Sequence, residues 1–487
     1  MEKSLSQASG SGEYCTGNDV EAILPRSGGA MHSRGDIAAR LERLPAGRAM
    51  WRRVLLLSLG GFFEFYDMFM SAYVGPGLVK SGILTATTPG LFGTTGLAGF
   101  VAAFFAGLYL GTALFGFVAD RFGRRAIFTT SLLWYTVAAA IMAFQTTALG
   151  LDLWRFIAGI GIGVELVTID TYIAELVPRH IRGRAFAFNQ VVQFSAIPVV
   201  AFLAWLLVPH APFGLDGWRW VVLAGSAGAV IVWFIRLAVP ESPRWLAEHG
   251  RLTEADAIVT RFETQAVTEG AVLAEPSAEA GAETTRGSFV ELWRAPYRGR
   301  TLMLIVFNLF QTVGFYGFSN WVPSFLIKQG IAVTASLGYT FVIAIAAPFG
   351  PLLAAFYSDK IERKWLITGA ALSVAVFGLA FGETRDALPL IFFGALITLA
   401  NNIMSFSFHA YQAELYPTRI RALGVGFVYS FSRLSTVFSA FVIAFFLDRF
   451  GVAGVFVLIA ASMLVVALAI GFFGPRTRNL SLEAISR

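Results

Sequence analysis

The sequence predicts an all-α membrane protein in which twelve transmembrane helices form two pseudo-symmetric halves. Two observations predict this fold class: twelve apolar stretches of about 20 residues, and a set of motifs that recurs at one fixed offset. Composition agrees, because 56% of the 487 residues are hydrophobic and only 14% are charged. A soluble domain needs more charge to cover its surface, so much of this apolar surface must face lipid.

The apolar stretches occur in two sets of six. The first set lies at 54–79, 96–118, 126–145, 153–177, 185–208 and 219–239. The second lies at 301–327, 336–357, 365–382, 388–415, 423–447 and 452–473. They predict bundles at 51–239 and 301–474, which are flanked by polar segments at 1–50, 240–300 and 475–487.

The polar segments carry little predicted structure. Residues 1–50 lack the apolar core of a cleavable signal, so the first span is expected to act as an uncleaved insertion signal. The segment 240–300 opens with Pro240-Glu-Ser-Pro-Arg-Trp-Leu246, which predicts a surface helix running to Phe262. The Ala/Glu/Gly-rich composition around Ala266–Thr285 is typical of a flexible linker.

The distribution of basic residues predicts the orientation. The loops after even-numbered spans carry Arg121, Arg124, Arg125, Arg179, Arg182, Arg184, Lys360, Arg363, Lys364, Arg419 and Arg421. The loops after odd-numbered spans carry only Lys80, Lys328, Arg385 and Arg449. The positive-inside rule therefore places the even loops, the central segment and both termini in the cytoplasm. The net charge of +6 has the same origin and does not indicate a nucleic-acid partner.

The two halves share an internal repeat. The motif Ala174-Glu-Leu-x-Pro-x-x-Ile-Arg182 recurs as Ala413-Glu-Leu-x-Pro-x-x-Ile-Arg421, an offset of 239 (414 − 175). Pairs with this offset are Asp120/Asp359, Arg124/Arg363, Glu175/Glu414 and Arg182/Arg421. A duplicated six-helix unit explains the shared offset and predicts a substrate site between the halves, near mid-membrane.

The repeated charges allow two interpretations. A basic loop that only sets topology needs arginines but no fixed glycine or acid, whereas a gate latch needs both. In a latch, Glu175 and Glu414 accept hydrogen bonds from Arg124 and Arg363, close the cytoplasmic side and release it as the halves rock. The recurrence favours the latch, whose expected members are Asp120, Arg121, Arg124, Arg125, Glu175, Arg182, Asp359, Arg363, Glu414 and Arg421.

At these residues the chain resembles the major facilitator superfamily and, within it, sugar-porter-like metabolite:proton symporters. The segment 116–125 is similar to the superfamily signature, and sugar-porter motifs are matched at 155–163, 174–184 and 240–246. The resemblance spans about residues 54–475 and implies secondary active transport by alternating access. Glu64-Phe-Tyr-Asp67 instead resembles an acidic motif of organic-acid porters, so a sugar substrate is not implied.

Other chemistries find no support in the sequence. Gly159-x-Gly161-x-Gly163 lies in an apolar span with no preceding strand, which predicts close helix packing and not a nucleotide site. Cys15 is the only cysteine, so no intrachain disulfide or cysteine-clustered metal site is expected. No enzymatic activity and no cofactor are predicted, and an ion gradient would supply the energy.

Charged residues within the spans are candidates for proton coupling. Glu64 and Asp67 are three residues apart on one helix face, and two close carboxylates in a low-dielectric site do not both ionise easily. The resemblance pairs Asp67 with Arg155 and implies that protonation of Asp67 releases this arginine. The alternative is a permanent structural ion pair. The roles of Glu165 and Asp170 on the same span as Arg155 stay open.

Polar stripes on four spans predict a water-filled cavity. The resemblance places Gln190 and Gln311 at sugar-contacting positions, whereas His409 and Arg433 replace uncharged aromatic residues. A buried arginine suits a carboxylate, so the hypothesis is an organic anion held by Arg433 with His409 as hydrogen-bond partner. Snorkelling or pairing with an internal acid is the alternative for Arg433, and a bond to a neighbouring helix is the alternative for His409. The predicted substrate contacts are Gln190, Gln193, Gln311, Tyr316, His409, Ser432 and Arg433.

Together these observations predict a monomeric, multi-pass carrier in the inner (plasma) membrane. Its partners would be the lipid bilayer, a proton and a small organic acid that enters with that proton. The rival hypothesis is symport of a proton with a sugar or polyol. Two further alternatives are a transporter-like nutrient sensor and a drug efflux pump.

Overall fold

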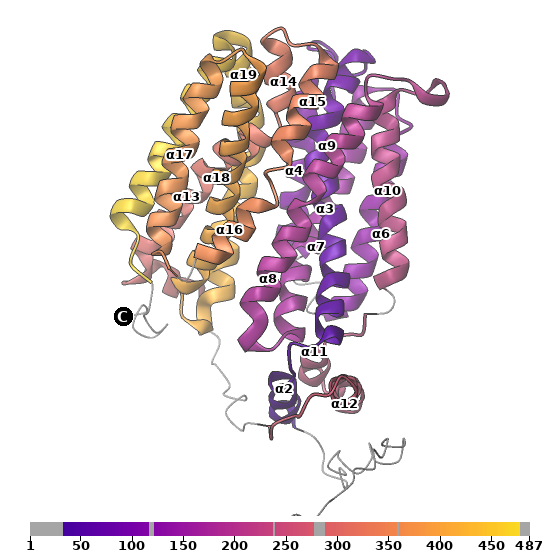
Figure 1. Ribbon diagram of the computed structural model, residues 1–487, viewed down its shortest axis with the longest axis vertical. Helices are drawn as coiled ribbons and strands as arrows, with labels where there is room; N and C mark the ends of the chain where they lie inside the picture. Colours follow the sequence, from indigo (N-terminus) through magenta and orange to yellow (C-terminus); the bar gives the residue numbers. More distant parts are fainter. Residues whose placement is uncertain (1–32, 116–120, 237–238, 277–287, 358–359, 478–487) are drawn as a thin grey trace, which may run out of the picture.

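The computed structural model describes residues 33–115, 121–236, 239–276, 288–357 and 360–477. Their regular secondary structure is helical, and one isolated bridge joins Pro89 to Thr95. In Figure 1 the N-terminal half, in indigo to magenta, stands beside the C-terminal half, in orange to yellow. We call the end that carries α2 (Arg34–Glu42), α11 (Pro243–Glu248) and α12 (Leu252–Thr268) the α12 end, and the other the far end.

Eleven helices or helix pairs in the described residues are long and apolar enough to cross a membrane. The N-terminal half contains α3 (Arg48–Lys80), α4 (Gly96–Phe115), α6 (Arg124–Met142), α7 (Ala148–Leu176), α8 (Arg179–Phe194), α9 (Ala196–Leu207) and α10 (Gly217–Arg236). The C-terminal half contains α13 (Tyr297–Ser319), α14 (Val322–Lys328), α15 (Val333–Ala344), α16 (Phe349–Tyr357), α17 (Arg363–Glu383), α18 (Ala387–Glu414) and α19 (Thr418–Phe473).

The last helix accounts for two of the twelve predicted spans. α19 has 56 residues, about twice the length that a bilayer requires, and its helical geometry is interrupted at Gly451, where φ is 69°. A positive φ is readily adopted by glycine, so the chain turns back there. The parts on either side of Gly451 correspond to the predicted spans at 423–447 and 452–473.

Glycines let α4 and α7 approach at backbone distance. A Cβ atom added at Gly107 would lie 2.0 Å from the carbonyl oxygen of Phe156, and one at Gly159 would lie 2.3 Å from that of Phe104. The hydroxyl of Thr112 also donates to the carbonyl oxygen of Gly163, at 3.1 Å. These contacts confirm that the glycines in 159–163 serve helix packing.

The polar segments hold more helix than the sequence predicts. The single surface helix expected from Pro240 to Phe262 is divided at Gly250, where φ is +76°, into α11 and α12. The helix α2 lies within the segment 1–50, where no helix is expected, and packs on α11 and α12. Its N-cap, Ser33, accepts a hydrogen bond from the amide of Asp36.

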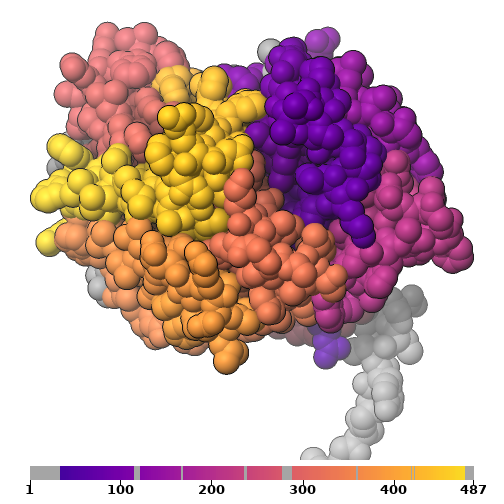
Figure 2. Space-filling model, turned by 90° about the horizontal axis from the view of Figure 1, so that it is seen from above, coloured from indigo at the N-terminus to yellow at the C-terminus, as the bar shows by residue number. Residues whose placement is uncertain are grey.

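Aromatic side chains join the two halves between the middle and the far end. The rings of Phe69, Phe105 and Phe194 lie within 6.3 Å, centre to centre, of Phe315 or Tyr316 on α13. Further toward the far end, α9 and α15 make a similar contact through the stacked rings of Trp205 and Phe341. Viewed from above, the halves meet along one seam (Figure 2).

Candidate functional site

A buried ion pair links α3 to α7 in the N-terminal half. The guanidinium of Arg155 is fully buried and donates to Oδ2 of Asp67 at 2.6 Å and to the Asp67 carbonyl oxygen at 2.6 Å. Ser71, one helical turn beyond Asp67, accepts two further hydrogen bonds from Arg155, at 2.9 and 3.2 Å. The ring of Phe104 lies 4.0 Å from Cζ of Arg155.

These contacts show which interactions of Arg155 depend on the charge of Asp67. Neutralising the carboxylate would remove the ion pair but leave the bonds to the Asp67 carbonyl and to Ser71. Sequence reasoning named Asp67 and Arg155 but missed Ser71 and Phe104. The spacing of Ser71 from Asp67 was an available signal, whereas nothing in the sequence places Phe104 on α4 over this arginine.

A second set of polar side chains contains residues from both halves. In the C-terminal half, Arg433 donates to the hydroxyl of Tyr316 at 2.6 Å and to that of Tyr429 at 2.9 Å. In the N-terminal half, Glu64 is fully buried and near enough to act electrostatically on both Arg433 and Tyr429. Tyr316 also contacts Met68 across the seam, at 3.8 Å from oxygen to sulfur. We call Glu64, Tyr316, Tyr429, Arg433 and His409 the central cluster.

The environment of Arg433 differs from both sequence-based alternatives. It does not snorkel, because only 2% of it is exposed and it bonds to a tyrosine of α13. In the described part of the chain its hydrogen bonds go to neutral tyrosine hydroxyls, and no carboxylate lies within ion-pair distance. Its Nε is buried and has no hydrogen-bond partner among the described residues. The guanidinium therefore retains an unused donor and a charge without a contacting counter-ion.

His409 and Ser432 lie beside this arginine, but their hydrogen bonds in the structure are local. Nδ1 of His409 is 2.7 Å from the carbonyl oxygen of Ser405 on its own helix, and its ring lies 5.3 Å from that of Tyr429. The hydroxyl of Ser432 donates to the carbonyl oxygen of Tyr429 at 2.7 Å. His409 is half-buried, and within the described residues its hydrogen bond uses Nδ1 alone, whereas Ser432 is buried and its donor is used by the helix.

The glutamines lie on the two sides of the seam. Gln193 on α8 packs against Gly61 of α3, where an added Cβ would be 2.4 Å from its Nε2, so it lies within one turn of Glu64. Gln190, one turn before Gln193, is half-buried. Gln311 is buried on α13, one turn before Phe315, whose ring meets Phe194 across the seam. The structure thus places Gln193 against α3 of the N-terminal half and Gln311 on α13 of the C-terminal half.

The repeated charges at the α12 end form matching ion pairs, one in each half. Arg124 bonds to Glu175 at 2.9 Å between α6 and α7, and Arg363 pairs with Glu414 between α17 and α18. Arg182 donates to the carbonyl oxygen of Val177, as its repeat partner Arg421 does to that of Tyr416. Each of these contacts lies within one half, and their role as a latch that breaks as the halves rock stays a prediction.

The remaining expected gate members are less informative. Asp120 and Asp359 lie outside the described residues, and Arg121 is exposed. The backbone amides of Arg124 and Arg125 donate to Glu241 at 3.0 and 3.1 Å. Sequence reasoning missed this role of Glu241, which lies at the start of α6 and satisfies amides that a helix leaves without partners.

Known proteins resemble this chain along almost its whole length. Residues 54–487 match the sequence profile of the family described as sugar (and other) transporter. The niacin transporter NiaP of Acinetobacter baylyi is 30% identical over 454 residues, which cover 92% of this chain and 99% of that protein. The inner membrane metabolite transport protein YdjE of Escherichia coli is 29% identical over 475 residues, 94% of this chain and 99% of that protein.

A solved structure shares the fold. The partially occluded, inward-open xylose transporter XylE from E. coli superposes with a TM-score of 0.71 at 20% identity, and the match covers 89% of this chain and 100% of that chain. The expected resemblance to sugar-porter-like transporters is confirmed, as is an all-helical, multi-pass membrane protein. The family is one of transporters and not of enzymes.

Proposed function

Because the chain belongs to the sugar (and other) transporter family, we propose that it is a proton-coupled symporter of a small organic acid in the cell's inner membrane. Transport of a small molecule follows from the family. The more specific parts of the proposal are that the substrate is an organic acid and that a proton is transported with it. The central cluster and the Asp67–Arg155 pair support these two parts.

The observation that carries the organic-acid proposal is the environment of Arg433. A buried cation without a contacting counter-ion is costly, and a bound carboxylate would offset that cost. A carboxylate can also accept two parallel hydrogen bonds from a guanidinium, one of them from the Nε that has no partner among the described residues. The hydroxyls of Tyr316 and Tyr429 can then turn toward the same anion. Niacin, which names one relative, is itself a carboxylic acid.

The charge of Glu64 supplies a reason for co-transport with a proton. An ionised Glu64 acts on Arg433 with the same sign of charge as a substrate carboxylate, so the two anions compete for one guanidinium. Protonation of Glu64 removes this competition and favours loading. Asp67 would add a second step, because its protonation breaks the ion pair to Arg155 and leaves that residue's neutral contacts in place.

The arrangement of the halves supports alternating access. Aromatic contacts close the seam between the central cluster and the far end, whereas Asp170, which lies nearer the α12 end of α7, is exposed. The central cluster would therefore load and unload through the α12 end in this conformation. With the orientation expected from the basic loops, this end faces the cytoplasm.

Thermal stabilisation of the purified protein by carboxylic acids tests the substrate class. We expect niacin and related monocarboxylates to raise the unfolding temperature more at pH 6 than at pH 8. The shift should be lost in Arg433→Gln and retained in the matched control Arg449→Gln, which changes an exposed arginine at the far end. A carboxylate shift of equal size in Arg433→Gln would overturn the assignment of the site.

Symport of a sugar or polyol is the second candidate, because Gln193 and Gln311 lie on the two sides of the seam. The same panel separates the two functions. A shift with a neutral sugar that survives Arg433→Gln but is lost in Gln311→Ala would support a sugar carrier and make Arg433 part of the scaffold.

A further inference from the structure

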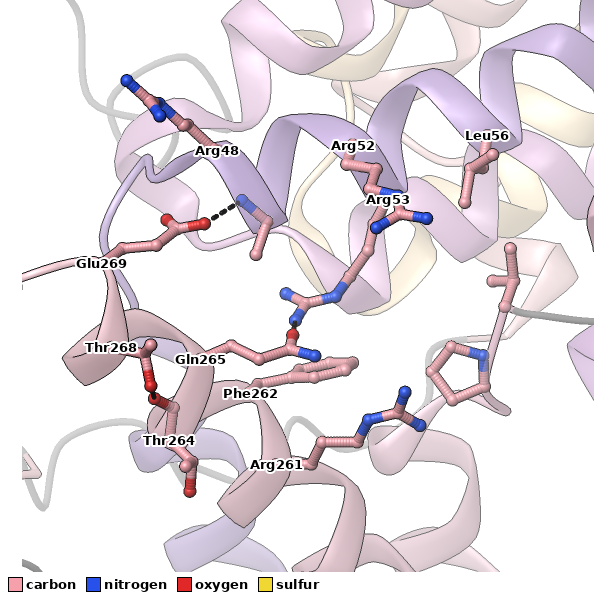
Figure 3. A pocket seen from close by; sticks show the side chains of 13 residues that line it. Arg48, Arg52, Arg53, Leu56, Arg261, Phe262, Thr264, Gln265, Thr268 and Glu269 are labelled. Atoms are coloured by element: carbon pink, nitrogen blue, oxygen red, sulfur yellow. Dashed lines mark hydrogen bonds between the residues drawn. The ribbon is translucent and has the colours of Figure 1, made fainter. Parts of the chain in front are cut away.

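A cationic pocket of about 620 Å³ lies at the α12 end, away from the central cluster. It opens between the first turns of α3 and the helix α12, as Figure 3 shows. Four arginines line it: Arg48, Arg52 and Arg53 from α3, and Arg261 from α12. Nothing in the proposed transport cycle uses these residues.

The arginines are not neutralised by the residues around them. Glu269 is the one carboxylate among the described lining residues, and its Oε1 accepts a hydrogen bond from the amide of Ala49 at 2.7 Å, at the start of α3. None of the four arginines forms an ion pair within the described ranges. Arg261 acts unfavourably on the charge of Arg53, and this effect exceeds the favourable effect of Glu269. Like charges held together in this way stabilise a bound anion.

One of these arginines is held in place by the pocket itself. The guanidinium of Arg53 stacks on the ring of Phe262, 3.6 Å from its centroid, and donates to Oε1 of Gln265. A guanidinium that is already positioned loses less entropy on binding, because its flexible side chain is ordered before the ligand arrives. Arg48, Arg52 and Arg261 are exposed and can close around an anion beside it.

The position of the pocket indicates the source of the anion. α3 is a candidate membrane span that begins at Arg48, so its first turns lie where the chain enters the bilayer. Leu56 and Val239 give the pocket an apolar wall next to the arginines. A phospholipid presents this combination, a phosphate at the interface and acyl chains just below it.

We propose that this pocket binds the phosphate group of an anionic phospholipid and so ties α12 to the first span. The bound phosphate would offset the repulsion between Arg53 and Arg261, which belong to the two elements that form the pocket. Anionic lipid would therefore stabilise the docking of α12 on the N-terminal half.

Lipid binding to the full-length protein in neutral detergent tests this proposal. We expect phosphatidylglycerol to raise the unfolding temperature and phosphatidylcholine to have much less effect. In Arg52→Gln/Arg261→Gln the apparent affinity for phosphatidylglycerol should fall about tenfold or more, since two charge-assisted contacts are lost. Arg294→Gln/Arg298→Gln, which removes two exposed charges elsewhere in the chain, should bind the lipid like the original protein.

A charge-preserving variant and a second ligand distinguish lipid binding from misfolding and from binding of a soluble anion. Arg52→Lys/Arg261→Lys keeps the charge and should retain most of the binding, which shows that the loss in the glutamine variant is not caused by misfolding. Equal stabilisation by both lipids, or unchanged phosphatidylglycerol binding in the glutamine variant, would overturn the proposal. Inorganic phosphate that protects as well as the lipid would assign the pocket to a soluble anion and also contradict it.

Discussion

At the scale of single residues, the Asp67–Arg155 pair is where a proton can change an interaction without dismantling the site. Asp67→Asn removes the charge, but the bonds from Arg155 to the Asp67 carbonyl and to Ser71 persist. We therefore expect proton-driven accumulation of substrate to be abolished, while substrate counterflow across the membrane remains. The measurement is a comparison of the two assays in proteoliposomes. Asp448→Asn, at an exposed ion pair, is the control.

An opposite result would assign the pair a structural role. If Asp67→Asn still accumulates substrate against its gradient, the ion pair is part of the scaffold. If it fails in both assays, a variant that keeps the carboxylate distinguishes loss of the acid from damage to the fold. Asp67→Glu, which retains a carboxylate, should then restore accumulation in part, because an acid can again pair with Arg155.

A substitution at Tyr429 tests the central cluster more directly than one at Arg433, because replacing tyrosine by phenylalanine removes a single oxygen atom. Tyr429→Phe deletes the hydroxyl that accepts from Arg433 at 2.9 Å and leaves the ring packed against His409. A hydrogen bond to a charged group contributes about 1.5–3 kcal/mol, so carboxylate affinity should fall roughly ten- to hundredfold. Binding titrations measure this, with the exposed Tyr357→Phe as control. Unchanged affinity would remove Tyr429 from the site.

The sequence singled out the buried charged residues of the candidate site but not the side chains that contact them. Glu64, Asp67, Arg155 and Arg433 stand out because charge within an apolar span is costly and therefore conspicuous. That Arg433 bonds to Tyr316 could not be predicted, since the two residues lie 117 positions apart on different helices. Helical periodicity relates residues only within one helix, so contacts across the seam need the fold.

At the scale of helices, the contact between α4 and α7 depends on glycine. A Cβ at Gly107 would lie 2.0 Å from the backbone oxygen of Phe156, which cannot move as a side chain can. Gly107→Ala should therefore lower the free energy of unfolding by on the order of 1–3 kcal/mol or more. Gly426→Ala meets open space and should be neutral or slightly stabilising. Thermal unfolding in detergent compares them, and equal midpoints would contradict the close approach.

The helix α2 shows why short polar helices are missed in sequence analysis. It has no long apolar pattern, and its docking rests on contacts with distant residues, such as Arg40 with Glu263 and with Asp256. Glu42 accepts bonds from the amide of Arg179 and from Arg244, and it lies 3.5 Å from Arg182. These partners are 137 or more positions away in the chain, so no local signal could reveal them.

The docking of α2 should depend on pH through Glu42. Burial opposes ionisation of this carboxylate, but the bond from Arg179 and the bond and charge of Arg244 outweigh burial and hold its pKa below its usual value. A lowered pKa means that the contribution to stability is complete above the unfolded-state pKa of about 4.3 and is lost as the pH falls further. The protection of residues 34–42 against hydrogen exchange, relative to the intrinsic rate at each pH, should therefore fall below about pH 4. In Glu42→Gln this segment should be less protected at neutral pH, and its protection should depend less on pH.

At the scale of the whole molecule, the repeat predicted from the sequence is visible in matching contacts. The ion pair Arg124–Glu175 in the N-terminal half has its counterpart in Arg363–Glu414 of the C-terminal half. The two pairs join corresponding helices and are 239 positions apart in the sequence. The apolar lengths predicted the spans, because a bilayer fixes how long a helix must be. The sequence could not predict the conformation, since rocking of the halves leaves the composition of every helix unchanged and alters only which aromatic side chains meet.

The conformation itself can be tested by restraining the far end. Phe202 on α9 and Phe341 on α15 have ring centres 5.4 Å apart, so cysteines at these positions can be joined by a short bifunctional thiol reagent. Cys15 is the only native cysteine, and Cys15→Ser supplies the background. We expect the cross-link to abolish transport, because the halves must separate at this end for the central cluster to reach the opposite side. A cleavable reagent should restore transport on reduction, and each single cysteine variant should transport normally. Undiminished transport after complete cross-linking would mean that the far end does not open, and the rocking mechanism would have to be abandoned.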